Sequence, residues 1–357
     1  MVEKIQIINY KSIVDLTLDL GRFNVIIGTN GCGKSNILEA ITMASASHQR
    51  KLDTEFLLNR NVRVTEPFFM TNAFDDVEQN DGHMYFVVNG NDGQYYNIGS
   101  NLIHYEKTKT WKNLLEGSSV VRPDNITNQH GLTQFSATIE EFASFLSYRP
   151  IENYLREVKD SPIYPLGIRG EGLMQYLKTI STNEEHRELF LKINEGLRML
   201  DWFDGFNIPD GLLSNEYKLS IGDKFLKDSL HFFDQRSTNE GFLYLLFFLT
   251  LFNSKDSPQF FAVDNIETSF NPGLCQNLTK YLVKTTKENG KQVILTTHNP
   301  FVLDGMDLSD DEIRLFVCRR DIDGHTKIER VKYREDRKMS LSELWMSGLI
   351  GALPDNF

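Results

Sequence analysis

The sequence predicts an α/β fold with a mixed central sheet, and three stretches support this prediction. A glycine-rich stretch at residues 28–35 joins a short apolar run to a helical pattern. Two further apolar runs, residues 260–263 and 292–297, lead directly into Asp264 and His298. Buried parallel strands have such apolar sequences, and polar residues at their carboxyl ends gather at one edge of the sheet, where ligands bind.

Length and composition indicate the class of protein. With 357 residues and 40% hydrophobic content, the chain is expected to form one large α/β domain with insertions, or two lobes. The net charge of −11 argues against nucleic-acid binding through bulk charge alone, although a local basic groove stays open. The three cysteines have no pairing or metal spacing, which suits a reducing cytoplasm.

No apolar run in the sequence is long enough to cross a membrane. The longest, residues 241–252, is expected to be a buried helix. The N-terminus moves directly into a strand pattern, which predicts that no signal peptide precedes it. We therefore expect a cytoplasmic protein without a membrane partner.

Residues 28–35 match the phosphate-binding pattern G-x-x-x-x-G-K-[ST] without a mismatch. The glycines let backbone N–H groups curl around phosphate oxygens, and the following helix presents its positive N-terminus to the same anion. Lys34 is expected to bind the β- and γ-phosphates, and the Ser35 hydroxyl to bind Mg²⁺. The strand–loop–helix context disfavours a chance match in a glycine-rich turn, so the sequence predicts a P-loop NTPase core.

The N-terminal third combines strand and helix signals. Two strands are expected within residues 4–20, a third at 24–27 and a helix at 35–46. Residues 52–58 are polar and show no clear periodicity. Strand–turn–strand signals at residues 83–111 predict an antiparallel β side sheet beside the nucleotide site.

The middle of the chain is predicted to be a helical insertion. Helical periodicity covers most of residues 138–200, and residues 217–226 are expected to form a hairpin around Gly222-Asp223. No heptad run of useful length occurs, so no coiled-coil arm is expected. These patterns divide the chain into an N-terminal nucleotide-binding lobe, a helical insertion and a C-terminal lobe, at residues 1–130, 131–230 and 231–357.

Asp264 ends an apolar strand and is expected to hold Mg²⁺ opposite the phosphate loop. In most enzymes of this kind a glutamate follows as the base, but here the next residue is Asn265. An amide can hold a water but cannot take its proton, so intrinsic hydrolysis should be slow. Glu267 could substitute if the backbone stays extended; otherwise it is a solvated loop acid.

His298 follows another apolar strand. A lone histidine is more often structural than catalytic, but the carboxyl end of a buried parallel strand is the ligand edge of the sheet. We therefore expect His298 to sense a γ-phosphate there.

With these elements the chain resembles the ABC-type ATPase group that includes the SMC, Rad50, RecF and OLD-family proteins. Residues 9–13 (NYKSI), which contain Lys11, look like the short motif that precedes Walker A in that group. Residues 260–264 look like Walker B, residues 268–272 like the D-loop, and His298 in TTHNP like the switch histidine. Residues 237–243 look like the signature motif of that group, with Asn239 at the position where a serine is usual.

The resemblance implies ATP and Mg²⁺ as cofactors and a homodimer or higher oligomer that closes around ATP. It implies catalytic roles for Asp264, Asn265, Glu267 and His298, and metal binding by Ser35 and Asp264. The cofactor-binding residues that it implies are Lys11, Asn30, Gly31, Cys32, Gly33, Lys34, Ser35, Asn36, Asn239 and Gly241.

More specifically, the chain resembles stand-alone bacterial ATPases of the AAA15/AAA21 grouping, which are common in phage-defence loci. The similar stretches are residues 145–153, 165–173, 341–345 and 353–357. This resemblance implies a nucleotide switch that regulates a separate effector protein, a nuclease or toxin. Two alternatives stay open: a RecF-like DNA-repair ATPase that clamps DNA, and an ATP-binding scaffold without turnover.

The C-terminal region provides no nuclease of its own in this interpretation. Asp321 and Asp323 follow an apolar strand, but too few residues remain for a Toprim domain, and Asp323-Gly324 is typical of a hairpin turn. A basic run interleaved with acids follows, and it is either a solvated hairpin or a surface for DNA or a partner. Its members are Arg319, Arg320, Lys327, Arg330, Lys332, Arg334, Arg337 and Lys338.

Overall fold

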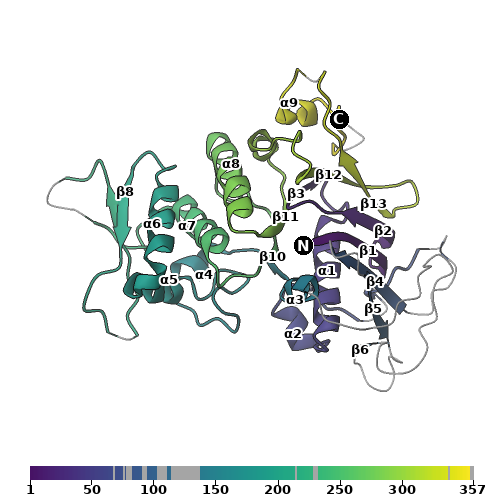
Figure 1. Ribbon diagram of the computed structural model, residues 1–357, viewed down its shortest axis with the longest axis horizontal. Helices are drawn as coiled ribbons and strands as arrows, with labels where there is room; N and C mark the ends of the chain where they lie inside the picture. Colours follow the sequence, from purple (N-terminus) through teal and green to yellow (C-terminus); the bar gives the residue numbers. More distant parts are fainter. Residues whose placement is uncertain are drawn as a thin grey trace.

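The computed structural model describes residues 1–66, 69–74, 77, 83–90, 95–102, 111–113, 137–213, 215–227, 232–336 and 338–353. Figure 1 shows an elongated molecule, with the phosphate-loop helix α1 and an antiparallel sheet at one end and a group of helices at the other. The strands β10 and β11 and the helix α8 lie between these ends. The two ends of the molecule are therefore joined by the central sheet.

The central sheet has six strands in the order β13-β12-β3-β11-β10-β7. The last strand along the chain, β13, pairs antiparallel with β12, and all other pairs are parallel. The sheet is therefore mixed, as the sequence predicts. Its strands are β3 (Phe23–Gly28), β7 (Leu146–Tyr148), β10 (Phe260–Val263), β11 (Gln292–Thr296), β12 (Ile313–Arg320) and β13 (Thr326–Val331).

The second sheet is antiparallel and has the order β2-β1-β4-β5-β6. It confirms the predicted side sheet, although residues 91–94 and 103–110 of the predicted stretch lie outside the described residues. Its strands are β1 (Val2–Tyr10), β2 (Ile13–Asp19), β4 (His83–Gly90), β5 (Tyr95–Leu102) and β6 (Trp111–Asn113). Three helices pack with it: α1 (Lys34–His48), α2 (Thr54–Leu58) and α3 (Ala137–Ala143).

The central sheet separates two hydrophobic cores. Phe261 and Val263 of β10 belong to the core shared with the helical end, whereas Phe260 and Ala262 belong to the core under the antiparallel sheet. This alternation is the period of two that a strand buried on both faces requires. It explains why β10 has no polar residue before Asp264.

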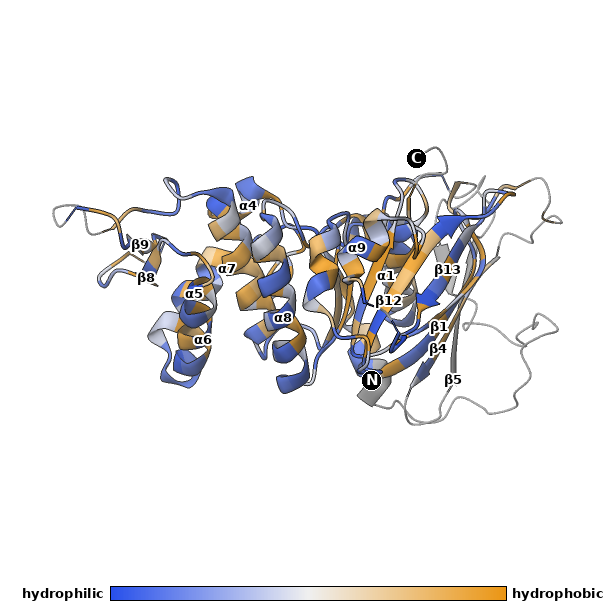
Figure 2. Ribbon diagram, turned by 90° about the horizontal axis from the view of Figure 1, so that it is seen from above, coloured by the Kyte–Doolittle hydropathy of each residue, from blue (hydrophilic) through white to orange (hydrophobic). Residues whose placement is uncertain are grey.

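The helical end is built around α7 (Glu240–Asn253), the long apolar segment of the sequence. Twelve of its residues are buried, from Phe242 to Asn253. Figure 2 shows this helix in orange between the bluer outer helices and α8. Burying each Leu or Phe side chain contributes about 1.5–3 kcal/mol, so α7 organises this end. The surrounding elements are α4 (Glu152–Arg156), α5 (Leu173–Thr182), η3 (Glu184–His186), α6 (Arg187–Leu197), β8 (Phe203–Asn207), β9 (Ser220–Asp223) and α8 (Pro272–Glu288).

The predicted hairpin at residues 217–226 is wrong. Gly222 and Asp223 lie in strand β9, which pairs antiparallel with β8 across Phe203–Asn207. The partner of β9 is therefore β8, which precedes residues 217–226 in the sequence. This pairing buries Phe203 and Phe206 of β8 together with Ile221 of β9. The glycine that suggested a turn stands in the strand instead, opposite Gly205.

The C-terminal elements follow the strand that precedes His298. A short helix, η4 (Pro300–Gly305), packs against α9 (Leu341–Met346), and the Ser342 hydroxyl donates to Asp304 Oδ2 over 2.7 Å. The turn at Asp323-Gly324 joins β12 to β13, which confirms the predicted hairpin there. Of the C-terminal stretch that carries the subgroup resemblance, residues 354–357 lie outside the described part of the chain.

Candidate nucleotide-binding site

The phosphate loop joins β3 to α1 at the carboxyl edge of the central sheet. Gly28, Gly31 and Gly33 have φ angles of 155°, 77° and 115°. At Gly33 a Cβ atom would lie 2.2 Å from Thr326 Oγ1, so only glycine fits between the loop and β13. The loop therefore has the positive-φ geometry that turns backbone N–H groups toward an anion.

Lys34 is buried at the start of α1 and bonds to its own loop. Its Nζ donates to Gly28 O over 2.7 Å and to Thr29 O over 3.0 Å. Neutral carbonyls bind an ammonium less strongly than phosphate oxygens do. A bound nucleotide would therefore draw Lys34 from these carbonyls.

The β12–β13 hairpin holds the loop from the other side. Thr326 Oγ1 donates to Cys32 O over 2.9 Å, and Arg320 Nε donates to Gly31 O over 3.0 Å. Ser12 links the same threonine to Asn36, with both side-chain bonds at 2.7 Å. Part of the predicted basic run thus positions the phosphate loop. No local pattern in the sequence indicates this role, because Arg320 is 289 residues away from Gly31 along the chain.

Ser35 and Asp264, the two predicted magnesium ligands, lie together. Ser35 Oγ donates to Asp264 Oδ2 over 3.4 Å. Thr296 Oγ1 donates to Asp264 Oδ1 over 2.5 Å and accepts from the Asn265 N–H over 3.0 Å. A hydroxyl and a carboxylate suit Mg²⁺, which keeps several waters and needs few protein oxygens. These two residues therefore fit the ion that the motif implies.

The backbone after Asp264 turns sharply. Asn265 has φ 59°, in the left-handed region that asparagine tolerates better than most residues, and Thr268 bonds back to Asn265 O. The extended backbone that the sequence argument required for Glu267 is therefore not present. Glu267 still lies beside the site, because its Oε1 accepts the His298 N–H over 2.8 Å. Its Oε2 is buried and has no hydrogen-bond partner.

His298 lies two residues beyond β11, at the same edge of the sheet. Partial burial of the ring and the charge of Lys34 lower the pKa of His298, while Glu267 and Asp264 oppose this. The ring is therefore neutral at pH 7, so one nitrogen can accept and the other can donate. Four predicted residues from three separate stretches, Lys34, Asp264, Glu267 and His298, interact electrostatically here.

A small cavity of about 140 Å³ opens beside Ser35 and Asp264. Its other walls include Arg60, Arg63 and Arg149, which no motif in the sequence indicates. These arginines surround the carboxyl edge of β7 and the end of α2, so tertiary packing alone brings them to the magnesium residues. The cavity gives the site a cationic wall.

Lys11, predicted to bind nucleotide, lies at the edge of this cavity region. It has φ 49°, and its Nζ donates to Glu39 Oε2 over 2.5 Å and to Arg63 O over 3.1 Å. Arg63 also bonds to the buried Glu39 and donates to Asn36 Oδ1 over 2.8 Å. Nucleotide contact by Lys11 and Asn36 stays a prediction, and both residues are tied to the α1 surface next to the loop.

The signature-like residues lie at the helical end, away from the phosphate loop (Figure 1). Asn239 is the N-cap of α7, and its Oδ1 accepts the Phe242 N–H over 2.9 Å. Glu240 accepts the Ser269 hydroxyl over 2.8 Å, which links this helix start to the D-loop-like segment. At Gly241 a Cβ would lie 3.2 Å from Ser269 O, so a larger residue would press on that segment.

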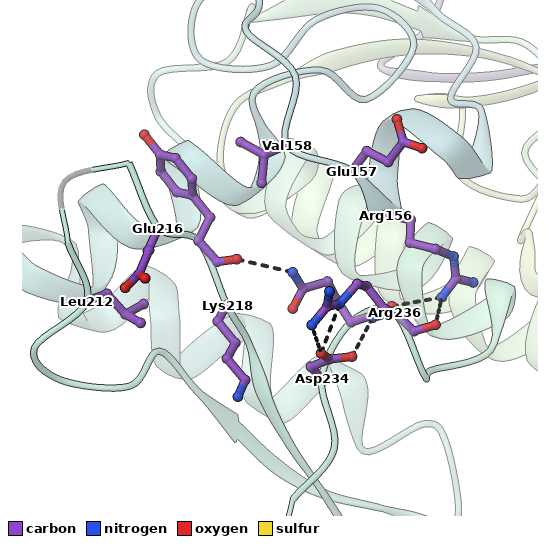
Figure 3. A pocket seen from close by; sticks show the side chains of 10 residues that line it. Arg156, Glu157, Val158, Leu212, Glu216, Lys218, Asp234 and Arg236 are labelled. Atoms are coloured by element: carbon purple, nitrogen blue, oxygen red, sulfur yellow. Dashed lines mark hydrogen bonds and ion pairs between the residues drawn. The ribbon is translucent and has the colours of Figure 1, made fainter.

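Arg156 of α4 supports the segment before Asn239. Its Nη1 donates to the carbonyls of Gln235, Arg236 and Thr238 over 2.8, 2.9 and 3.0 Å. Figure 3 shows this arginine at the rim of a cavity of about 680 Å³ between α4 and the segment that leads to α7. Much of the charge on these walls is already paired, as between Arg236 and Asp234. The residues that line this larger cavity differ from those that line the cavity beside Ser35 and Asp264, so the two cavities are separate.

Comparisons with known proteins agree with this geometry. A model of the RecF/RecN/SMC N terminal domain matches residues 1–321. The chain belongs to this family. Membership implies an ATPase-type nucleotide-binding domain that uses ATP and Mg²⁺ in general. No curated protein matches the sequence of this chain.

Solved SMC heads have the same fold at low sequence identity. The SmcHead bound to the C-winged helix domain of ScpA is 14% identical, with a TM-score of 0.59, covering 95% of this chain and 99% of that chain. An Smc head with an extended coiled coil, bound to the C-terminal domain of ScpA from Pyrococcus furiosus, is 12% identical, with a TM-score of 0.59 and 98% coverage of both chains. The SMC head domain from Thermotoga maritima is 16% identical, with a TM-score of 0.50, covering 93% and 99%.

The comparison confirms the predicted SMC-head fold. Within the residues that the structure describes, no long coiled-coil arm is evident. Among the same residues, no helix is long and apolar enough to cross a membrane.

Proposed function

We propose that this chain binds ATP with Mg²⁺ at the carboxyl edge of its central sheet, hydrolyses it slowly and acts as a dimerising switch. One observation carries the proposal: Lys34, Ser35, Asp264 and His298 converge at that edge from three separate stretches. Membership of the RecF/RecN/SMC family supports it.

Each residue has a role that follows from its position. The loop N–H groups and the N-terminus of α1 hold the phosphates, and Lys34 neutralises the β/γ charge. Ser35 and Asp264 would hold Mg²⁺, which neutralises charge between phosphate oxygens. Thr296 orients Asp264 through the hydrogen bond to Oδ1.

Slow turnover follows from Asn265. An amide cannot accept the proton of an attacking water, and general-base catalysis contributes about 10²–10⁴-fold in rate. The Oε2 atom of Glu267 has no hydrogen-bond partner, and we propose it as a weaker substitute base. His298 is exposed at the same edge, and we propose that its ring contacts the γ-phosphate.

We propose that the active state is a homodimer in which Asn239 and Gly241 of one copy face the phosphate loop of the other. Two features support this. In a single chain these residues start α7 at the helical end, and the Asn239 side chain caps its own helix. The D-loop-like Ser269 also connects the start of α7 to the segment that follows Asp264. Dimer closure at the start of α7 can therefore affect the position of Asp264.

The switch is proposed to regulate a separate effector, a nuclease or toxin, in bacterial anti-phage defence. The resemblance to stand-alone ATPases of phage-defence loci supports this role. Two similar SMC heads are bound to domains of ScpA, which supports the use of such a head as a platform for a partner protein. The remaining candidate is a RecF-like ATPase that clamps DNA, and the arginines around the small cavity favour testing it.

Steady-state hydrolysis tests the slow switch. Wild type should turn over well below the about 10 s⁻¹ that is typical of enzymes, and Asn265→Asp should raise the rate about tenfold or more. Aspartate is the better replacement because it tolerates the left-handed backbone at φ 59°. Asn265→Ala is the matched control and should not gain activity. Turnover of tens per second in wild type, unchanged by Asn265→Asp, contradicts the slow switch.

DNA binding separates the two candidate functions. A DNA clamp should bind duplex DNA only with ATP, and its affinity should fall steeply with salt as counterions are released. The effector switch predicts weak DNA affinity that ATP does not change.

A further inference from the structure

Two of the three cysteines lie together beneath the phosphate loop. Cys318 of β12 is paired in register with Gly28 of β3. A Cβ atom on Gly28 would lie 2.7 Å from Cys32 Sγ, so the Cys32 sulfur packs directly on that glycine. Cys318 Sγ also donates to Cys32 O over 3.5 Å. These three observations place both cysteine side chains next to Gly28, beneath the loop.

The surroundings of the two buried thiols favour the thiolate form of one of them. The hydrogen bond from Cys318 and the Lys34 ammonium, 3.8 Å from Cys32 Sγ, lower the pKa of Cys32. The same hydrogen bond and burial raise the pKa of Cys318. Burial and the charge of Glu267 raise the pKa of the third cysteine, Cys275, to about 12. Because the thiolate is the nucleophile, Cys32 should react first and Cys275 last.

We propose that Cys32 and Cys318 form a modification site, at which a hydroperoxide oxidises the pair to a disulfide that stops the phosphate loop from binding nucleotide. Formation of the disulfide is inferred from the geometry of the two thiols. The effect of the disulfide on nucleotide binding rests on the proposed function.

The chemistry balances with the hydroperoxide as the only co-reactant. The Cys32 thiolate attacks the terminal peroxide oxygen, the O–O bond breaks, and the alkoxide leaves as an alcohol after taking a proton. The resulting sulfenic acid is attacked by the Cys318 sulfur, which forms the S–S bond and releases the hydroxyl as water with the Cys318 proton. Two thiols are oxidised, and one hydroperoxide is reduced to an alcohol and water.

The disulfide would change the loop. A disulfide requires the sulfurs to approach to about 2.05 Å, much closer than a thiol hydrogen bond allows. The strand carrying Cys318 lies within the central sheet, whereas Asn30 and Gly31 of the loop are exposed, so the loop must make the movement. Cys32 would then be tied to β12, and its N–H could no longer adjust to a phosphate. By linkage, bound nucleotide should protect the thiols from oxidation.

The test uses the full-length reduced protein, hydrogen peroxide as the oxidant and peptide mapping by mass spectrometry. We expect a peptide pair linked through Cys32 and Cys318, lighter by two hydrogen atoms, with Cys275 still reduced. ATP with Mg²⁺ should slow its formation several-fold. The oxidised protein should bind ATP at least tenfold more weakly, and dithiothreitol should restore the affinity.

Two variants sharpen the test. With Cys318→Ser, Cys32 should stop at the sulfenic acid, which dimedone traps, whereas the matched control Cys275→Ser should still form the disulfide. If Cys318→Ser does not fold, mapping of the wild-type protein alone decides. The peroxide treatment is one that fully oxidises an unstructured cysteine peptide. If Cys32 and Cys318 are both still reduced after it, the proposal is wrong. The proposal is also wrong if the disulfide forms and the affinity for ATP is unchanged.

Failure of the proposed function gives a different result. If the reduced protein binds no ATP, but peroxide still links Cys32 to Cys318, the modification site stands and the nucleotide switch falls. If ATP binds and the link does not form, the switch stands and the modification site falls.

Discussion

The two edges of the central sheet each contain a buried lysine. Lys34 bonds to partners within its own loop, whereas Lys291 bonds to partners in a different segment of the chain. At the amino edge, Lys291 is fully buried and its Nζ bonds to Ser257 Oγ over 2.6 Å. Gln292 beside it uses its whole side-chain amide on the backbone of Val2 and Gly21. Every one of these contacts joins elements that are far apart in the sequence. The amino edge therefore holds the two sheets together.

At the carboxyl edge, Lys34 bonds within its own loop, to the carbonyls of Gly28 and Thr29 and to Cys32 Sγ. Glu267 Oε2 is buried without a partner, and the neighbouring Asn30 and Gly31 are exposed. Buried polar groups are normally satisfied, so spare hydrogen-bonding capacity marks a place for a ligand. The difference between the edges shows that burial alone does not indicate the role of a lysine. The hydrogen-bond partners of the lysine distinguish a structural role from a role in ligand binding.

The largest expected effect separates the two lysines directly. Lys34→Ala should weaken ATP binding more than about a hundredfold, because a buried charge-assisted contact to phosphate is worth several kcal/mol. Lys291→Met should leave ATP affinity within about twofold, because it acts at the other edge. Isothermal titration calorimetry measures both, and similar losses in the two variants would break the comparison.

Gln292→Leu tests the structural role of the amino edge. It removes the side-chain partner of the Val2 N–H and of the Val2 carbonyl, whereas the Gly21 carbonyl keeps its bond from Asn24 Nδ2. The free energy of unfolding should therefore fall by about 3 kcal/mol. Urea unfolding measures this loss. ATP affinity of the folded variant should be unchanged; a selective loss of ATP binding would mean that the amino edge is not purely structural.

Because Lys291 is buried, we also expect the free energy of unfolding to depend on pH. Burial lowers the pKa of Lys291 to about 7, well below its unfolded value. Between pH 7 and 9 the unfolded state binds a proton that the folded state does not, so stability rises with pH by up to about 1.4 kcal/mol per unit. Lys291→Met should remove this rise. The measurement is the difference between the two unfolding free energies across that window, and a constant difference contradicts the buried neutral lysine.

Thr296→Val should give the smallest effect, at the carboxyl edge. It removes the hydroxyl that bonds both Asp264 and the Asn265 N–H, so we expect a loss of about 1–2 kcal/mol in unfolding free energy. Thr286→Val is the matched control, because the Thr286 hydroxyl is buried without a partner and its loss should be neutral or stabilising. Equal effects in both variants would show that Thr296 does not support Asp264.

The features that the sequence predicts are those that depend on local pattern. The phosphate loop, the apolar strand before Asp264 and the helix α7 are each specified by contiguous residues, and the structure has them. The meeting of Ser35 with Asp264 follows from the rule that parallel strands bring their carboxyl ends to one edge. The short helix α2 was missed, although Asp53 caps it through the Phe56 N–H, a recognisable N-cap signal.

The features that the sequence does not predict depend on contacts across the fold. The hairpin expected at Gly222 was wrong because β9 pairs with β8, whose residues are buried with it. The support of the loop by Arg320 and Thr326, and of the signature-like segment by Arg156, needs the folded positions of distant strands and helices. A single sequence has no local pattern that encodes such pairs.

Subunit complementation tests the central claim, a nucleotide site shared between two copies, most directly. Lys34→Ala damages the phosphate loop, and Gly241→Leu damages the signature-like segment through its contact with Ser269. Each variant alone should lack ATP-dependent dimers in analytical ultracentrifugation and have little hydrolysis. Mixed together with ATP and Mg²⁺, they should form mixed dimers with one intact site and recover a substantial fraction of wild-type hydrolysis. A mixture no more active than the separate variants, while wild type hydrolyses ATP as a monomer, would contradict the account.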